Sequence, residues 1–322
     1  MPDVETTTPS RARAALAGLE WRNYIIYIGF AAVFLFFAVT LSGSGFLTLN
    51  NLVNIVNQTA TISVIAVGMT FVIASAEIDL SVGAVAGLAS VTTAMGIAQF
   101  GLVPGIVIGL GTGALVGALN GALVTMVRIP SFLVTLGMLG IAHGTAQWIT
   151  KSAPQPILND TYNQIFGSGS LGPIPSLIVW TAVIVTIGVI VMNKTSFGRQ
   201  VLATGGNRVA AEFSGISTKK IKFAVLMACG TTAALAGMLY AGRLSSGRYQ
   251  WGTGDELSAI AAVILGGTSL AGGRGSVIGA LVGSLMIGLI NNGLILAGLE
   301  ASQQEIIRGV IIIAAVALGR RK

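Results

Sequence analysis

Side chains that could catalyse a reaction are scarce in this sequence. The chain of 322 residues has one histidine, His143, and one cysteine, Cys229, and both lie within apolar stretches. Neither has a partner at the spacing of a metal site or of a nucleophile–base pair. We therefore expect His143 to be a packed or pore-lining residue and Cys229 to form no disulfide. The chain is predicted to be no enzyme and to bind no metal ion.

A glycine-rich segment at residues 266–275 superficially resembles a phosphate-binding loop. It lacks the Lys-Ser/Thr pair that must follow the last glycine to hold phosphate and magnesium. It also joins two apolar stretches, whereas such a loop joins a strand to a helix. The chain is therefore predicted to bind no cofactor and not to hydrolyse ATP itself.

Two acidic residues, Glu77 and Asp79, lie in a short connection between apolar stretches. Asp79 or Ser81 can cap the helix that follows, because their side-chain oxygens can accept from its unpaired N–H groups. A proton relay through Glu77 or Asp79 is the alternative. Carboxylates are otherwise absent from the middle of the apolar stretches as we place them, which argues against transport driven by protons or sodium ions.

Uncharged polar side chains inside the apolar stretches are more informative. Asn54, Asn57, Gln58 and Thr61 recur at steps of three and four residues and so share one helix face. That face can hydrogen-bond a neighbouring helix or line a path for a polyhydroxylated solute. The same two interpretations apply to three further amides, which complete the candidate translocation path: Asn120, Asn291 and Asn292.

Composition places these residues in a membrane. The chain is 53% hydrophobic and only 9% charged, whereas soluble domains carry about 25% charged residues. A bilayer core about 30 Å thick needs about 20 apolar residues per helix, and backbone pairing within the bilayer requires helices or a closed barrel. The stretches lack the alternating period of a membrane barrel, so the fold class is all-α.

Apolar stretches separated by turn residues predict ten transmembrane helices. The predicted spans are 24–41, 52–75, 80–98, 102–127, 131–150, 176–192, 221–242, 256–271, 275–297 and 304–319. With ten crossings, nearly every basic cluster falls on the cytoplasmic side, as the positive-inside rule requires. The net charge of +7 is therefore a topology signal and does not indicate nucleic acid. Both termini, tails 1–23 and 320–322, and the loop 193–220 are predicted to be cytoplasmic, around a transmembrane domain at 24–319.

Glycine spacing predicts close helix packing. Six glycines recur at every fourth position and give one helix a smooth stripe: Gly101, Gly105, Gly109, Gly113, Gly117 and Gly121. Packing within the chain is the favoured interpretation, and a seam between two subunits is the alternative. Residues 62–67 also resemble 257–262, and 81–84 resemble 276–280, so an internal duplication is a further hypothesis.

Several motifs together resemble the ribose-type (simple sugar) ABC importer permeases. The cytoplasmic loop carries TSFGR at 195–199 and ATGGN at 203–207, followed by Ala210-Ala211 and Gly215-Ile216. Further matching blocks lie at 68–73, 78–83, 129–132, 135–138, 261–270 and 272–275. Glu77 stands where a glycine is commoner in that family and His143 where an arginine is expected, so the roles of these two residues stay open.

The resemblance implies a binding-protein-dependent importer in a prokaryotic cytoplasmic (inner) membrane. Its partners would be an ATPase subunit that hydrolyses ATP, an extracytoplasmic solute-binding protein and a second permease copy in a homodimer. The solute would be a pentose, hexose or polyol; a branched-chain amino acid or a signalling furanose is the alternative. A stand-alone secondary transporter is the rival from another class.

The cytoplasmic loop is predicted to couple the permease to its ATPase. Asn207 can cap a short helix, Ala210 and Ala211 can present a small surface for close packing, and Gly215 can end the helix in a left-handed conformation. The complete predicted coupling set is Gly198, Arg199, Gly205, Gly206, Asn207, Ala210, Ala211 and Gly215.

Overall fold

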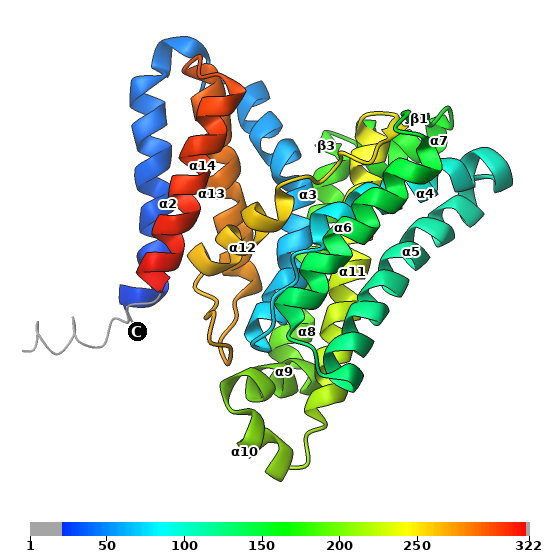
Figure 1. The fold of residues 1–322 in the computed structure, drawn as a ribbon. Coiled ribbons are helices and arrows are strands. Elements are labelled where there is room, and N and C mark those ends of the chain that lie inside the picture. Colours follow the sequence, from blue (N-terminus) through cyan, green and yellow to red (C-terminus); the bar gives the residue numbers. More distant parts are fainter. Residues whose placement is uncertain (1–20, 320–322) are drawn as a thin grey trace, which may run out of the picture.

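The computed structural model describes residues 21–319, and almost all of them belong to helices or to the short connections between helices (Figure 1). Residues 1–20 of the predicted N-terminal tail and the predicted tail 320–322 lie outside the described residues. The first described helix begins at Trp21, three residues before the predicted span. The all-α class is confirmed.

A helix stands at each of the ten predicted spans. These helices are α2 (Trp21–Thr40), α3 (Leu49–Ala74), α4 (Val82–Phe100), α5 (Leu102–Ala122), α6 (Ser131–Thr150), α8 (Ser176–Lys194), α11 (Thr218–Arg243), α12 (Asp255–Leu265), α13 (Val277–Leu296) and α14 (Ala301–Gly319). Within the described residues, seven helices are long and apolar enough to cross a membrane. The number of crossings and the side of each terminus stay predictions.

One predicted span differs from a full membrane helix. The sequence places a span at 256–271, but α12 has 11 residues and rises about 16 Å at 1.5 Å per residue. That length covers about half of a hydrocarbon core of about 30 Å. Residues 266–271, which the predicted span includes, instead belong to an irregular connection that runs to α13.

The shorter elements lie between these helices. They are the 3-10 turn η1 (Ser42–Ser44), the π-helical turns η2 (Leu123–Val127) and η3 (Gln164–Ser168), the short helices α7 (Asp160–Asn163), α9 (Ser196–Gly206) and α10 (Arg208–Phe213), and the strands β1 (Gln155–Pro156), β2 (Ser170–Leu171), β3 (Ile174–Pro175) and β4 (Ser246–Gly247). β1 pairs antiparallel with β4, and β2 with β3. The turn η2 continues α5 without a break.

Helix α11 is the centre of the larger group of helices. It packs against α3, α4 and α5, while α6 packs against α4. A second group of α2, α13 and α14 stands beside it, and α3 and α12 lie between the two groups (Figure 1). The helix hairpin α9–α10 projects beyond the ends of the spans.

The glycine stripe of α5 packs within the chain, as favoured above. Gly105 and Gly109 face α4, whereas Gly113, Gly117 and Gly121 face α11. A Cβ built on Gly113 would lie 2.2 Å from the carbonyl oxygen of Gly230, so only glycine lets the two backbones approach this closely. Gly101, the first member, instead precedes the helix in a left-handed conformation with φ of 91°.

The connection 151–175 folds into a small cap at the end opposite α9 and α10. Tyr162 is fully buried there, donates a hydrogen bond to the Met238 carbonyl oxygen at 2.9 Å and stacks on Phe166, which in turn stacks on Trp180. The pairing of β1 with β4 ties this cap to the chain that follows α11. The cap is therefore an ordered surface on that end of the molecule.

Candidate translocation path and coupling surface

The polar face of α3 leads from the protein surface into its interior. Asn54 and Gln58 are exposed, Asn57 is partly buried, and Thr61 is 2% exposed. The Asn57 side-chain oxygen and the Thr61 hydroxyl are both buried and have no hydrogen-bond partner in the part of the chain that the structure describes. Because unpaired buried polar atoms are costly, these two are suited to a hydroxylated solute or to water that is exchanged for one.

At Thr61, the polar face of α3 approaches polar side chains of α11 and α12. The Thr61 hydroxyl approaches the Tyr240 phenol of α11, and Tyr240 donates a hydrogen bond to Asp255 at 2.8 Å. Asp255 and Glu256 form the first turn of α12. Asp255 directly precedes the predicted span 256–271, and Glu256 is its first residue.

The position of Asp255 and Glu256 follows from the chain before α12. Ser90 of α4 is hydrogen-bonded to Arg248, whereas Gly83, seven residues earlier in the same helix, faces Gly252 and Glu256. Seven helical residues span about 10 Å, so the irregular segment 248–254 descends by that distance along α4. Helix α12 thus starts inside the molecule, as the broken helices of transporters do.

The three remaining amides of the predicted path occupy different places. Asn292 exchanges two hydrogen bonds of 2.9 and 3.0 Å with Asn51, one turn before Asn54, and so joins α13 to α3. Asn292 therefore makes the interhelical hydrogen bonds that were one of its two interpretations. Asn291 is partly buried beside Arg308 of α14. Asn120 is fully buried and donates to the Ser81 hydroxyl at 3.0 Å, at the α4–α5 contact rather than on the α3 face.

The α3–α4 connection is fixed by its two acidic residues. Asp79 is buried and accepts from the Ser81 N–H at 2.9 Å and from the Ser81 hydroxyl at 2.6 Å, just before α4 begins. The predicted capping role is wrong for both residues, because the Asp79 hydrogen bonds end at Ser81, before the helix, and the Ser81 side chain makes no cap hydrogen bond to α4. Glu77 forms an ion pair with Lys222 of α11. His143 meets the Tyr249 ring edge-on, with centroids 5.2 Å apart.

The cytoplasmic loop forms the helix hairpin that its sequence predicts. The Asn207 side chain accepts from the Ala210 N–H at 3.0 Å and caps α10, and Gly215 follows the helix with φ of 81°. The expectation that Ala211 presents a packing surface is wrong, because Ala211 is 4% exposed. The side chains presented outward are apolar and larger: Val209 is 61% and Phe213 is 89% exposed.

A backbone contact connects this hairpin to the end of α3 and to the chain after α12. Gly205, near the end of α9, lies against the Ala74 carbonyl at the end of α3, and a Cβ built on it would lie 1.9 Å from that oxygen. The same Ala74 oxygen accepts from the Gly273 N–H at 3.0 Å, in the connection after α12. Gly198 packs similarly on the end of α8, against Met192. We call the contact of Gly205, Ala74 and Gly273 the glycine joint.

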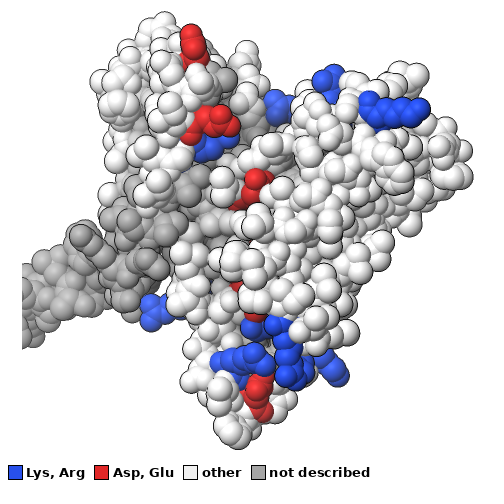
Figure 2. All heavy atoms as spheres, viewed as in Figure 1, with Lys and Arg blue, Asp and Glu red and all other residues white. Residues whose placement is uncertain are grey.

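Positive charge gathers at the hairpin end of the molecule (Figure 2). Arg208 and Glu212 form an exposed ion pair at 2.9 Å, and Thr218 donates to the same carboxylate at 2.6 Å. The hydrogen bonds from Thr218 and Arg208 hold the pKa of Glu212 below its ordinary value. Arg199 is exposed on α9. The positive-inside rule assigns this end to the cytoplasm.

Comparisons with known proteins match almost the whole chain. The model of the branched-chain amino acid transport system / permease component family matches residues 51–316. The ribose import permease protein RbsC of Escherichia coli (strain K12) is 39% identical over 292 residues, covering 88% of this chain and 90% of the relative. RbsC of Bacillus subtilis (strain 168) is 40% identical, with 88% and 89% covered. The xylose transport system permease protein XylH of Escherichia coli (strain K12) is 34% identical, with 98% and 96% covered. No solved structure matches the chain.

Proposed function

The chain belongs to the branched-chain amino acid transport system / permease component family, and from that premise we propose that it is the membrane-spanning subunit of an ATP-driven importer for a sugar or sugar-like solute. The observation that carries the proposal is its identity of 39% and 40% to two ribose import permeases over 88% of its length. The chain is a multi-pass permease of a bacterial cytoplasmic membrane. Its proposed partners are an ATPase, an extracytoplasmic solute-binding protein and a second copy of the permease.

The polar face of α3 and the start of α12 form the proposed path. Buried, unpaired oxygens at Asn57 and Thr61 lead toward Tyr240 and Asp255, and hydroxyl-rich solutes are bound by such alternating donors and acceptors. Asn292 and Asn120 stabilise the helices beside the proposed path, since their amides are hydrogen-bonded to Asn51 and Ser81.

The proposed coupling element is α10, docked on the ATPase by Val209 and Phe213. Large apolar side chains that are more than half exposed beyond the ends of the spans favour a protein partner. The glycine joint then gives the docked hairpin a direct contact with the ends of α3 and of the chain after α12.

Uptake by the reconstituted importer tests the function. Permease, ATPase and binding protein in proteoliposomes should accumulate radiolabelled ribose or xylose only with ATP inside, and a proton ionophore should leave the uptake rate unchanged. Uptake that continues without ATP and stops with the ionophore would instead identify a secondary transporter. Asp255 and Glu256 are carboxylates inside the molecule, as ion-coupled transport requires.

Two variants test the docking surface. Phe213→Ser should abolish co-purification of the ATPase, because it removes the most exposed apolar side chain of α10, whereas Phe213→Leu keeps an apolar group and should retain it. Equal recovery of the ATPase with both variants would refute the docking assignment.

The double variant Asn57→Leu/Gln58→Leu tests the path. It should lower the uptake rate at least tenfold in complexes that still assemble, since the solute loses polar partners while α3 stays helical. Unchanged uptake would exclude this face from the path.

A further inference from the structure

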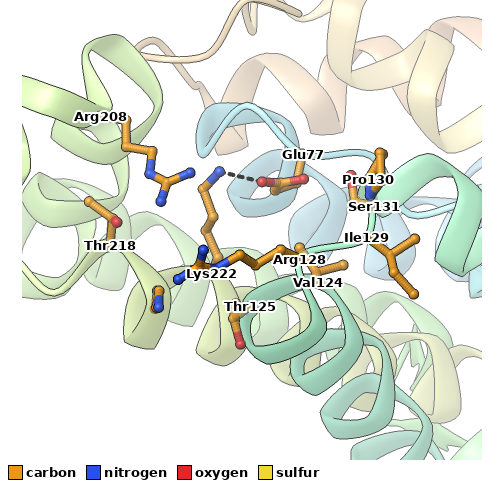
Figure 3. Close-up of a pocket in the computed structure, with 11 residues that line it drawn as sticks. Glu77, Val124, Thr125, Arg128, Ile129, Pro130, Ser131, Arg208, Thr218 and Lys222 are labelled. Carbon is orange, nitrogen blue, oxygen red and sulfur yellow. Dashed lines mark hydrogen bonds and ion pairs between the residues drawn. The ribbon is translucent and has the colours of Figure 1, made fainter.

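We propose that a basic pocket beside the coupling hairpin binds the phosphate group of an anionic phospholipid in the cytoplasmic leaflet. The pocket has a volume of about 220 Å³ and lies where the end of α5, the start of α6 and the start of α11 meet α10. Figure 3 shows the side chains of Arg208, Arg128 and Lys222 extending toward the same space. The proposal concerns a lipid ligand and does not depend on which solute is imported.

The pocket has more positive side chains than nearby carboxylates neutralise. Four basic side chains line it: Arg128, Arg208, Lys219 and Lys222. The carboxylate of Glu77 in the pocket wall pairs with Lys222, and Glu212 outside it pairs with Arg208. The salt bridges of the described residues leave Arg128 and Lys219 without an acidic partner. These two positive charges favour an anionic group such as a phosphodiester, and Arg can hold such a group with two hydrogen bonds.

The backbone around Arg128 is arranged to present that side chain. Arg128 follows the π-helical turn η2 with φ of 68°, a left-handed conformation that is strained for a non-glycine residue. Ser131, the first residue of α6, and Pro130 directly before it line the same pocket, so the positive end of a 20-residue helix points at its contents. A strained arginine and a helix N-terminus thus converge on one space.

The apolar surface next to the pocket distinguishes a lipid from a free anion. Met126 and Val127, in the turn before Arg128, are 73% and 60% exposed, and Phe132 and Leu136, just after the pocket on α6, are 48% and 51% exposed. Acyl chains can lie on this face while the headgroup occupies the pocket at the level where the spans end. Basic pockets between helices on the cytoplasmic side are a recognised setting for anionic headgroups, whereas a soluble phosphate has no use for the apolar flank.

Lipid retention by the purified permease tests the proposal. Membranes containing phosphatidylglycerol are solubilised, the full-length permease is purified in mild detergent, and bound lipids are counted by native mass spectrometry. Arg128→Gln/Lys219→Gln should reduce retained phosphatidylglycerol at least tenfold, given about 1 kcal/mol of lipid attraction for each basic residue. The control Lys194→Gln/Lys220→Gln removes the same charge from exposed positions outside the pocket and should retain lipid as the wild type does.

The competing occupants give different results. Addition of 10 mM inorganic phosphate should displace no lipid; if it displaces the lipid fully, the pocket recognises a free phosphate and the proposal fails. Addition of the ATPase subunit should leave the lipid count unchanged, and loss of lipid would show instead that an acidic surface of the partner fills the pocket. Equal retention by the pocket variant and the control would also overturn the proposal.

Discussion

Replacing Gly205 by alanine should uncouple ATP hydrolysis from transport. The added Cβ would lie 1.9 Å from the Ala74 oxygen and 2.8 Å from the Gly273 nitrogen, both of them backbone atoms. Carbon–oxygen contacts below 3.0 Å are essentially never found, so the joint must open by at least about 1 Å, at a cost of about 1–3 kcal/mol. If the glycine joint loses that free energy, the coupling between ATP hydrolysis and transport should fall by about 5- to 150-fold.

The neighbouring glycine supplies the control. A Cβ on Gly206 would meet Gly273 at 3.5 Å, an ordinary van der Waals contact, so Gly206→Ala should behave as the wild type. The assay is ATPase activity of the reconstituted importer with and without loaded binding protein. Gly205→Ala should lower the stimulation by at least about fivefold while the ATPase still co-purifies. Equal stimulation in both variants would refute the role of the glycine joint.

Two further substitutions test the packing on which the path depends. Gly113→Leu should lower the yield of monodisperse permease, because its Cβ would lie 2.2 Å from the Gly230 oxygen, whereas Gly111→Leu meets nothing within 4 Å and should express normally; similar size-exclusion profiles would contradict the α5–α11 seam. Asn51→Leu should lower thermal stability by about 1 kcal/mol, since it strands the buried Asn292 amide, and Asn51→Leu/Asn292→Leu should recover part of the loss; additive losses would exclude the amide pair.

The membrane helices could be predicted because their signal is local. Each long apolar stretch must pair its backbone internally, so hydropathy alone places α3, α5 and α13 within a few residues. The cap at Asn207 and the left-handed Gly215 were predictable for the same reason, since each depends on one residue and its immediate neighbours. The partners of the glycine stripe could only be assigned as internal once α4 and α11 were seen against it.

The sequence could not predict how deep in the molecule a residue lies or which face of a short helix is buried. Asp255 and Glu256 were assigned to the edge of a membrane span, because nothing local says that residues 248–254 descend along α4 before the helix begins. The available signal was the cluster of Gly252, Gly254 and two acids directly before an apolar run. Ala211 was placed on the wrong side of α10 because a six-residue helix is too short for its buried face to be read from periodicity.

If α10 docks on the ATPase as proposed, the contacts of the short helix α12 connect that end of the molecule to the proposed path. The first turn of α12 holds Asp255 against Tyr240. After its last residue, Leu265, an irregular connection leads to Gly273 in the glycine joint. An 11-residue helix that is not anchored across the whole bilayer can shift as a unit more easily than a full span. In the proposed coupling, movement of α9 at Gly205 is therefore transmitted to Asp255 through the connection 266–276 and the short helix α12.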